Sequence, residues 1–341
     1  MTATPLLSVR DLKTYFFMDE GIVKAVDGVS FDVYPGQVFG IVGESGCGKS
    51  VTMKAILRIV EPPGRIVGGQ ILLHRQKQNG VLETVDLVKL DANGQTMRDI
   101  RGAEIALIPQ EPMAAFSPVH TVGDQVIEAI LLHQKVSQRE ARAIALQMFK
   151  DVGIPMPEQR LDEYSWQLSG GLRQRAMIAM ALSCNPRLLI ADEPTTAVDV
   201  TTQAQVLRLL RRLQEQRNTA IIFITHDLGV IAQMAEYVMV MYLGLMMEQG
   251  PVDDIFHAPQ HPYTQALLRS IPTIRMTPRV NLPTISGSIP HPFNKPRGCP
   301  FHPRCEKAMP GKCDVRTPAL QPSGEKQFVS CFLYHDAEVS A

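Results

Sequence analysis

The sequence predicts an α/β fold in which a sheet with parallel strands is covered by helices. Three observations support this prediction. Helical periodicity alternates with short apolar, strand-like runs from residue 171 to residue 243. An apolar run at 37–42 is followed by a glycine-rich turn and a helical run at 51–59. Hydrophobic residues make up 45% of the 341 residues and charged residues 20%, which is typical of a globular chain and not of a disordered one.

The N-terminal third contains short strand-like runs that are bounded by turn signals. The expected strands lie at 6–12, 23–33, 37–42 and 105–109. The stretch at 70–94 is polar and poor in strand pattern, so we expect a hairpin or an insertion there.

The remainder of the chain changes from helical runs to a proline-rich segment. The helical stretch at 122–152 contains a capping box from Ser137 to Glu140. The elements expected after it are helices at 171–183, 202–216 and 228–234, and strands at 188–191, 220–225 and 238–243. Frequent proline beyond residue 258 disfavours long regular elements. We therefore expect two domains, 1–258 and 259–341.

Charge and composition argue against several classes of protein. Lys+Arg and Asp+Glu are equal at 34, so the net charge is +0, whereas a protein that coats nucleic acid normally has a basic excess. We find no apolar run long enough to span a bilayer and no signal-peptide pattern at the N-terminus. We therefore expect a cytosolic chain that reaches a membrane only by docking onto another protein.

The first motif with chemical meaning fits G-x-x-x-x-G-K-[ST], between an apolar strand and a helix. Its residues are Gly43, Glu44, Ser45, Gly46, Cys47, Gly48, Lys49 and Ser50, with Val51 next in the helix. The glycines let backbone N–H groups surround a polyphosphate, and the helix adds its positive end. Lys49 would reach the terminal phosphates and Ser50 would ligate Mg²⁺. The motif predicts a nucleoside triphosphate site; the alternative is a glycine turn with a solvated lysine.

Two acidic residues, Asp192 and Glu193, end the apolar strand expected at 188–191. A strand of an open α/β sheet delivers such residues to its carboxyl edge, where ligands bind. Asp192 is then the partner of Mg²⁺, and Glu193 orients and deprotonates the water that attacks the γ-phosphate. The alternative is an acidic pair that merely begins a turn before Pro194.

A second helix start has the character of an anion receptor. Ser169, Gly170 and Gly171 open a helix whose free N–H groups and dipole would face a phosphate. The alternative is that Ser169 simply caps the helix.

The order of these elements over about 180 residues resembles the ATP-binding cassette (ABC) ATPases. The elements are the glycine-rich motif, Gln110, the 168–172 helix start, the acidic strand end, Asp199 and His226. The resemblance implies a P-loop fold with an antiparallel β subdomain and a helical subdomain at about 112–166. It also implies that two such domains pair head to tail with two ATP molecules between them, each held by the glycine-rich motif of one subunit and the Ser169 helix of the other.

The same resemblance implies roles for four further residues. Gln110 senses Mg²⁺, the attacking water and the membrane partner, and His226 contacts the γ-phosphate. Asp199 lies at the dimer seam, and Phe16 stacks on adenine, with Tyr15 as the alternative. The sequence departs from the commonest family pattern at Leu172, where glutamine is usual.

Longer segments resemble the ATPase subunits of dipeptide and oligopeptide importers, above all the run at 261–268, His-Pro-Tyr-Thr-Gln-Ala-Leu-Leu. This implies an ATPase that powers uptake of peptides, with oligosaccharides or metal chelates as alternative solutes. The implied partners are a paralogous ATPase subunit in a heterodimer, two transmembrane permease subunits that dock at the helical subdomain, and an extracytoplasmic solute-binding protein. The implied location is peripheral, on the cytoplasmic face of the inner or plasma membrane.

Four cysteines are clustered in the proline-rich segment: Cys299, Cys305, Cys313 and Cys331. Four thiolates suit a [4Fe–4S] cluster or Zn²⁺, and the C-x₂-C spacing usual for zinc is missing. The importer resemblance implies the iron–sulfur cluster; Zn²⁺ and free structural thiols remain alternatives, with His302 and His335 as less favoured ligands.

Two other functions fit the residues less well. A soluble ABC protein that acts on DNA or ribosomes would carry long heptad runs or two cassettes, and neither is present in the sequence. An iron–sulfur regulatory module with a vestigial ATPase would not need Lys49, Glu193 and His226 intact.

Overall fold

The computed structural model divides the chain into two compact units. It describes residues 4–76, 82–111, 115–196, 199–271, 285 and 287–339. The first unit comprises Met1–Leu7, Val33–Val38 and Leu73–Ile224, and the second comprises Ser8–Asp32, Phe39–Leu72 and Thr225–Ala341.

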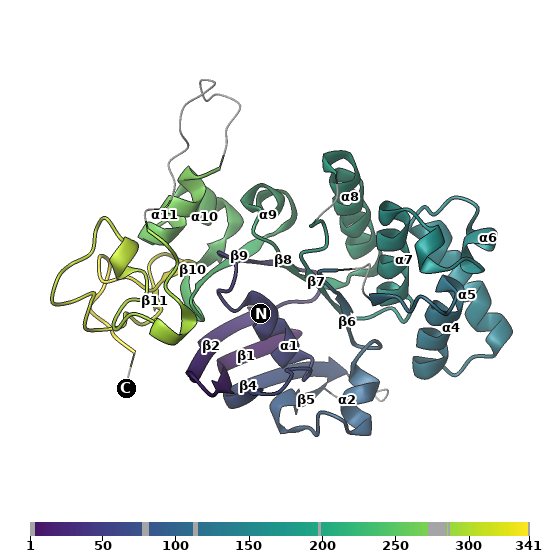
Figure 1. The fold of residues 1–341 in the computed structure, drawn as a ribbon, viewed down its shortest axis with the longest axis horizontal. Coiled ribbons are helices and arrows are strands. Elements are labelled where there is room, and N and C mark those ends of the chain that lie inside the picture. The colour runs from purple at the N-terminus through teal and green to yellow at the C-terminus, as the bar shows by residue number, and fades with distance from the viewer. Residues whose placement is uncertain are drawn as a thin grey trace. The chain divides into compact units, whose positions relative to one another are not determined.

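Three parallel strands lie at the centre of the first unit (Figure 1). They are β6 (Ile105–Ile108), β7 (Leu188–Asp192) and β8 (Ala220–Ile224), in the order β8-β7-β6. Ile105 pairs with Leu188, and Leu188 pairs with Ala220. Nearly all their residues are buried and apolar, as is usual for parallel strands with both faces covered. The parallel strands predicted here are confirmed.

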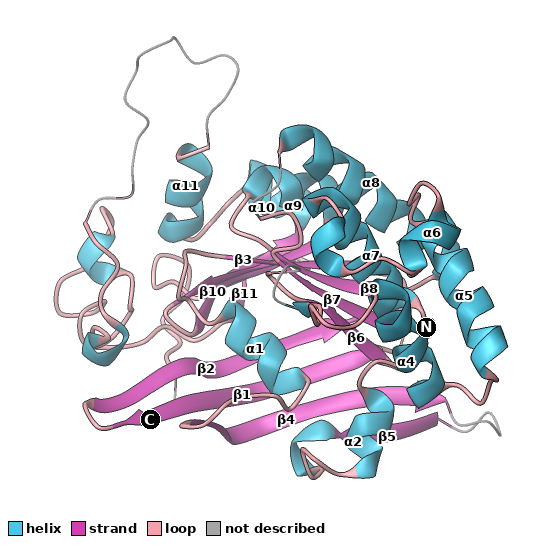
Figure 2. Ribbon diagram, turned by 45° about the vertical axis from the view of Figure 1, so that its right-hand side comes forward, coloured by secondary structure: helices cyan, strands magenta, loops and turns pink. Residues whose placement is uncertain are grey.

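Helices make up most of the rest of the first unit. They are α2 (Gln95–Ile100), α4 (Val122–His133), α5 (Gln138–Asp151), α6 (Pro157–Leu161), α7 (Gly170–Leu182) and α8 (Val200–Arg217), with short strand β5 (Leu82–Asp86) and the 3₁₀ turns η1 (Leu87–Lys89) and η2 (Ser165–Gln167). Helices α4, α5, α6 and α7 pack against one another (Figure 2). The predicted capping box is confirmed, because Ser137 and Glu140 exchange hydrogen bonds at the start of α5. Residues 112–114, where the helical subdomain was expected to begin, lie outside the described residues.

Three long strands, most of whose residues belong to the second unit, lie side by side (Figure 2). They are β1 (Leu7–Met18), β2 (Gly21–Val33) and β4 (Gly64–Gln76), in the order β2-β1-β4. The stretch at 70–94, where a hairpin or an insertion was expected, contains the end of β4 and the neighbouring strand β5, as in a hairpin. The statement that this stretch is poor in strand pattern was wrong for residues 70–76, since β4 continues through them. Ile71 and Leu73 are buried there, while their neighbours along the strand are partly or fully exposed. A strand with only one apolar face has a polar composition overall, so the composition of this stretch did not indicate a strand.

The second unit also contains strands of a mixed sheet, in the order β11-β12-β10-β9-β3. They are β3 (Val38–Val42), β9 (Tyr237–Tyr242), β10 (Leu245–Pro251), β11 (Gln321–Pro322) and β12 (Phe328–Val329). Strand β3 runs parallel to β9, and β9 turns back into β10 through Leu243 and Gly244, which both have positive φ. The β9–β10 hairpin extends the fold beyond the last strand that the sequence predicted.

Short elements dominate the second unit beyond β10. They are α10 (Val252–His257), α11 (Pro262–Arg269), η3 (Pro292–Asn294) and η4 (His302–Arg304), after α1 (Lys49–Ile56) and α9 (Leu228–Met234) earlier in the same unit. Short elements in this part of the chain agree with its frequent proline residues, which disfavour long helices and strands. The ammonium of Lys295 lies 3.2 Å from Oδ2 of Asp27 and so fixes this part of the chain to β2. Within the described ranges, no helix is both long and apolar enough to cross a bilayer.

Candidate functional site

The glycine-rich motif forms the turn between β3 and α1. Gly43 and Gly48 both have positive φ, and a Cβ at either position would collide with a backbone carbonyl, that of Met241 or of Ala25. The N-cap of α1 is Gly48, which has no side chain to cap the helix. A helix N-terminus without a side-chain cap is the kind of place where proteins bind anions.

The turn is organised by hydrogen bonds of its own. Lys49, only 5% exposed, donates from Nζ to the carbonyl oxygens of Gly43 at 2.7 Å and Glu44 at 3.1 Å. Cys47 is buried, and burial raises the pKa of its thiol. Ser45 and Gly46 are exposed at the tip. A polyphosphate would offer the ammonium stronger acceptors than these carbonyls.

The acidic pair lies where the sequence predicted it. Asp192 is the last residue of β7, and Glu193 follows with φ of 47°, in the left-handed region that costs a non-glycine residue about 1–3 kcal/mol. The N–H of Glu193 donates to the carbonyl of Ile224 at 2.9 Å, which holds this backbone in place.

Two side chains donate to the same carboxylate oxygen of Glu193. Gln110 Nε2 lies 3.2 Å from Oε2, and Thr196 Oγ1 lies 2.8 Å from it. Gln110 and Glu193 were both candidates from the sequence, and the structure brings them together. Thr196 was missed as a site residue; its position three residues after Glu193 is the only signal that could have found it.

The predicted second anion receptor is the exposed N-terminus of α7. Ser169 Oγ accepts a hydrogen bond from the N–H of Leu172 at 3.4 Å, so Ser169 is the N-cap. A Cβ on Gly170 would meet nothing within 4 Å, and one on Gly171 would only touch Thr202. The glycines are therefore not required by packing within this unit, which leaves their surface open to a ligand or a partner.

Asp199 is the N-cap of α8. Its carboxylate accepts from the N–H of Thr202 at 2.9 Å and from its hydroxyl at 2.7 Å, and these bonds lower the pKa of Asp199. The two residues before it in the predicted motif, 197 and 198, lie outside the described residues.

The two remaining candidates belong to the second unit. His226 is exposed, directly before Asp227, the N-cap of α9. Phe16 is partly buried on β1, where its ring lies close to Gly64. The hydroxyl of the alternative, Tyr15, donates to Oδ1 of Asp27 at 2.6 Å.

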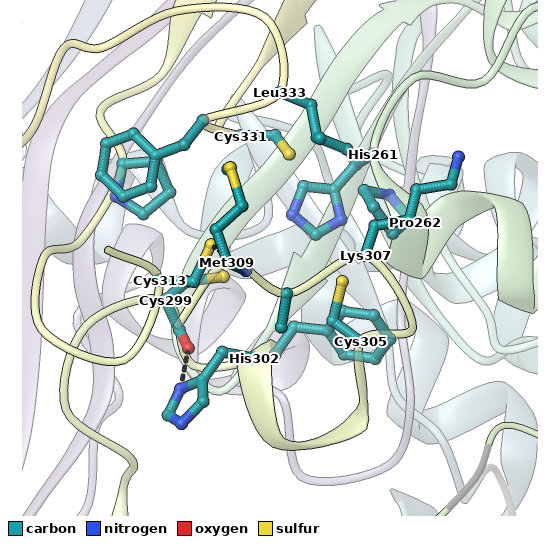
Figure 3. Close-up of a pocket in the computed structure, with 14 residues that line it drawn as sticks. His261, Pro262, Cys299, His302, Cys305, Lys307, Met309, Cys313, Cys331 and Leu333 are labelled. Atoms are coloured by element: carbon teal, nitrogen blue, oxygen red, sulfur yellow. Dashed lines mark hydrogen bonds between the residues drawn. The ribbon is translucent and has the colours of Figure 1, made fainter. Parts of the chain in front are cut away.

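A separate cavity is lined by four thiols (Figure 3). Cys299, Cys305, Cys313 and Cys331 surround it together with His261. All the cysteines are free. Burial raises the pKa of Cys299 to about 12 and that of Cys331 to about 11. Among the described residues, no three His, Cys, Asp or Glu side chains are arranged to hold a single metal ion.

Comparison with known proteins decides the family. The ABC transporter family model matches residues 26–196, and the model of the oligopeptide/dipeptide transporter C-terminal region matches residues 247–313. The chain belongs to the ABC transporter family. It is an ATPase of that family, and its two matched regions include both the glycine-rich motif and three of the four clustered cysteines.

The curated relatives of this ABC ATPase match it over nearly their full length. A probable peptide ABC transporter ATP-binding protein, y4tR of Sinorhizobium fredii, is 48% identical over 92% of this chain and 91% of its own. The oligopeptide transport ATP-binding protein AppD of Bacillus subtilis is 47% identical over 97% of each chain. The dipeptide transport ATP-binding protein DppD of Escherichia coli is 44% identical over 92% of each chain.

Solved structures of ABC cassettes share the fold. The cassette MJ0796, in a dimeric post-hydrolysis state with ADP and phosphate, superposes with a TM-score of 0.61 at 25% identity. The match covers 72% of this chain and 98% of that one. This confirms the predicted ABC-type fold class.

Proposed function

We propose that this ABC ATPase powers the uptake of dipeptides and oligopeptides through partner permeases. The support is that relatives named for peptide transport match 92–97% of the chain at 44–48% identity. The match of residues 247–313 to the oligopeptide/dipeptide transporter C-terminal region points the same way. Oligosaccharides and metal chelates are the alternative solutes.

In this proposal the glycine-rich motif and Val51 bind the triphosphate of ATP. Lys49 contacts the terminal phosphates, Phe16 stacks on adenine, and Ser50, Gln110 and Asp192 belong to the Mg²⁺ shell. The chemistry is transfer of a phosphoryl group to water, which requires positioning and charge stabilisation more than covalent help. Val51 and Ser50 lie in the first turn of α1, next to its uncapped N-terminus.

Glu193 is the proposed general base, supported by the hydrogen bonds to its carboxylate. Gln110 and Thr196 both donate to Oε2, which fixes the orientation of the carboxylate plane. A base fixed in this way deprotonates water without first having to reorient. His226 would contact the γ-phosphate as hydrolysis proceeds.

The second half of each ATP site comes, in this proposal, from another ATPase subunit. Ser169, Gly170, Gly171 and Asp199 would meet the ATP held by that subunit, and a paralogous partner is favoured. The exposed N-terminus of α7, with glycines that nothing in their own unit crowds, supports this role. Two permease subunits and an extracytoplasmic solute-binding protein would complete a transporter on whose cytoplasmic face the ATPase is peripheral.

Reconstitution tests the proposal. The ATPase is co-purified with its permeases and second ATPase subunit, placed in proteoliposomes with the solute-binding protein, and assayed with labelled di- and oligopeptides. We expect ATP-dependent peptide uptake that Glu193→Gln abolishes. Uptake of an oligosaccharide or a metal chelate, with none of any peptide, would overturn the peptide assignment and leave the ATPase assignment standing.

We also propose that the thiol cavity holds a [4Fe–4S] cluster. Cys299, Cys305, Cys313 and Cys331 line one cavity, and thiolates are the ligands such clusters use. The C-x₂-C spacing usual for structural zinc is missing from the sequence, which favours the cluster over Zn²⁺. Bound there, the cluster would supply a covalent link between four segments of a region with few regular elements.

Metal analysis tests this second proposal. Protein purified without oxygen should contain about four irons and four sulfides per chain. Cys305→Ser should lower both, while Cys184→Ser, outside the cavity, should leave them unchanged. Zinc in place of iron would contradict the cluster, and a brown protein without ATPase activity in the assembled transporter would favour a regulatory module over a transport ATPase.

A further inference from the structure

The proline-rich C-terminal part of the chain contacts the glycine-rich motif through an ion pair. Arg304 lies in η4, and its Nη1 and Nη2 are 2.7 Å from Oε2 and 3.1 Å from Oε1 of Glu44. Glu44 is the second residue of the motif. The Arg304 side chain is 5% exposed and that of Glu44 is 20% exposed. A paired, two-point contact of this kind fixes orientation as well as distance.

A second contact reaches the backbone of the same residue. The N–H of Glu44 donates to the hydroxyl of Tyr263, in α11, at 3.0 Å. Tyr263 is fully buried and packs against Tyr242 and Phe301. Arg304 also donates to the hydroxyl of Tyr242 at 3.2 Å. Two separate elements therefore reach Glu44, one through its side chain and one through its backbone.

These contacts leave Glu44 little freedom. Its N–H is held by Tyr263, its carboxylate by Arg304, and its carbonyl oxygen accepts from Lys49. Lys49 in turn reaches the carbonyl of Gly43. A loop that binds phosphate through backbone amides binds more tightly when its shape is set in advance, because less order has to be gained on binding.

We propose that Arg304 and Tyr263 are positioning residues of the ATP site: through Glu44 they hold the glycine-rich motif in its phosphate-binding shape. The affinity for ATP is then set partly by a region outside the nucleotide-binding motifs. Arg304 is adjacent in sequence to Cys305, which lines the thiol cavity. The inference rests on the proposed role of the motif in binding ATP.

The test measures the dissociation constant of MgATP on the full-length ATPase by calorimetry. Arg304→Gln should weaken binding about fivefold or more, the usual range for coupling between sites, and Arg304→Lys should restore part of it. Arg316→Gln is the matched control, because Arg316 pairs with Glu338 in the same C-terminal part and does not contact the motif. In the assembled transporter, Arg304→Gln should raise KM for ATP and leave kcat nearly unchanged.

Two further variants separate positioning from loss of folding. Glu44→Gln should weaken binding as Arg304→Gln does, and the double variant should lose no more than the larger single loss, because both remove one interaction. Tyr263→Phe keeps the buried ring and removes only the acceptor for the Glu44 N–H. Tyr263→Phe should also weaken ATP binding. If Arg304→Gln does not fold, the affinity of Tyr263→Phe for ATP tests the inference in its place.

A folded Arg304→Gln protein with unchanged affinity, or, if that variant does not fold, a Tyr263→Phe protein with unchanged affinity, overturns the inference. Fully additive losses for Arg304→Gln and Glu44→Gln overturn it as well. Lys49→Ala distinguishes this failure from failure of the proposed function. If Lys49→Ala loses ATP and the Arg304 variants do not, the motif still binds ATP without help from the C-terminal part. If Lys49→Ala also binds normally, the proposed phosphate site itself is wrong.

Discussion

Gln110 donates a hydrogen bond from Nε2 to Oε2 of Glu193 across 3.2 Å, although 83 positions separate the two residues in the sequence. Gln110 follows β6 and Glu193 follows β7, and these strands are parallel neighbours. The carboxyl ends of parallel strands meet at one edge of a sheet, which is where α/β proteins place their ligands. The strand pairing thus explains why a glutamine and a glutamate so far apart share one site.

Glu193→Gln should lower ATP turnover by about 10²–10⁴-fold, the usual contribution of a general base. The amide keeps the size of the side chain and can still accept from Gln110 and Thr196, so MgATP should bind as before. Phosphate release by the assembled transporter and MgATP binding by the isolated chain check the two halves of this prediction.

The matched control for that variant is Glu215→Gln on α8. Glu215 is exposed and pairs with Arg211 in the preceding turn of the same helix, so the chemical change is identical and lies outside the site. It should hydrolyse ATP at the wild-type rate. Near-normal turnover by Glu193→Gln would remove Glu193 from its proposed role.

Much of this site could be predicted because its signals are local. A glycine turn between a strand and a helix, or two acids at the end of an apolar strand, can be recognised within ten residues. Arg304 and Glu44 are 260 positions apart in the sequence, and no local sequence pattern predicts their contact. Thr196 was missed for another reason: threonine often occurs in turns, where its hydroxyl bonds to nearby backbone, so its presence there does not indicate a functional site.

Strand β4 shows the corresponding limit for the fold. Its polar composition reflects one exposed face, and its pairing with β1 and β5 makes Gly64–Gln76 a strand. The hairpin of β9 and β10 escaped prediction partly because its turn combines Leu243 with Gly244, and leucine is unusual at positive φ. Tertiary pairing decided both cases where local preference was weak.

Lys49→Ala should weaken MgATP binding by about 10- to 150-fold, the worth of a hydrogen bond that involves charge. The variant removes the ammonium that now contacts the carbonyls of Gly43 and Glu44 and would contact phosphates. Lys54→Ala on the same helix is the control, because Lys54 is exposed and pairs with Glu61. An unchanged dissociation constant for Lys49→Ala would argue against a phosphate site here.

Ser169 can be tested for a role beyond capping α7. Ser169→Ala loses the cap and should lower the free energy of unfolding by about 1 kcal/mol. Ser169→Asp keeps a capping oxygen and suits the helix dipole, but it would place a negative charge against the phosphates of the partner's ATP. We therefore expect Ser169→Asp to be as stable as wild type and to hydrolyse ATP at least about tenfold more slowly in the transporter.

Size-exclusion chromatography of Ser169→Asp in the Glu193→Gln background, together with the partner ATPase subunit, gives an independent measurement. ATP should drive pairing of the subunits in the Glu193→Gln protein and fail to do so when Ser169→Asp is added. If Ser169→Asp hydrolyses ATP and pairs with its partner as the protein without this change does, Ser169 acts only as the N-cap of α7 and not at the partner's ATP.

The ionisation of Asp27 should make the stability of the ATPase depend on pH. Burial raises the pKa of this carboxyl, but the hydrogen bond from Tyr15 and the charge of Lys295 outweigh it, so the pKa lies below its ordinary value. The folded state therefore binds this proton less readily than the unfolded state. The stabilisation by Asp27 is fully present above the unfolded-state pKa of about 4 and is lost as the pH falls from there through the lower pKa of the folded state.

Asp27→Asn should accordingly lower the free energy of unfolding by about 1–3 kcal/mol at pH 7, since it leaves Lys295 without its buried partner charge. The difference from wild type should shrink between pH 5 and pH 3, because wild-type Asp27 becomes neutral in the unfolded and then in the folded state. Urea unfolding at a series of pH values measures this difference. A difference that stays constant with pH for Asp27→Asn would contradict the ion pair as its cause.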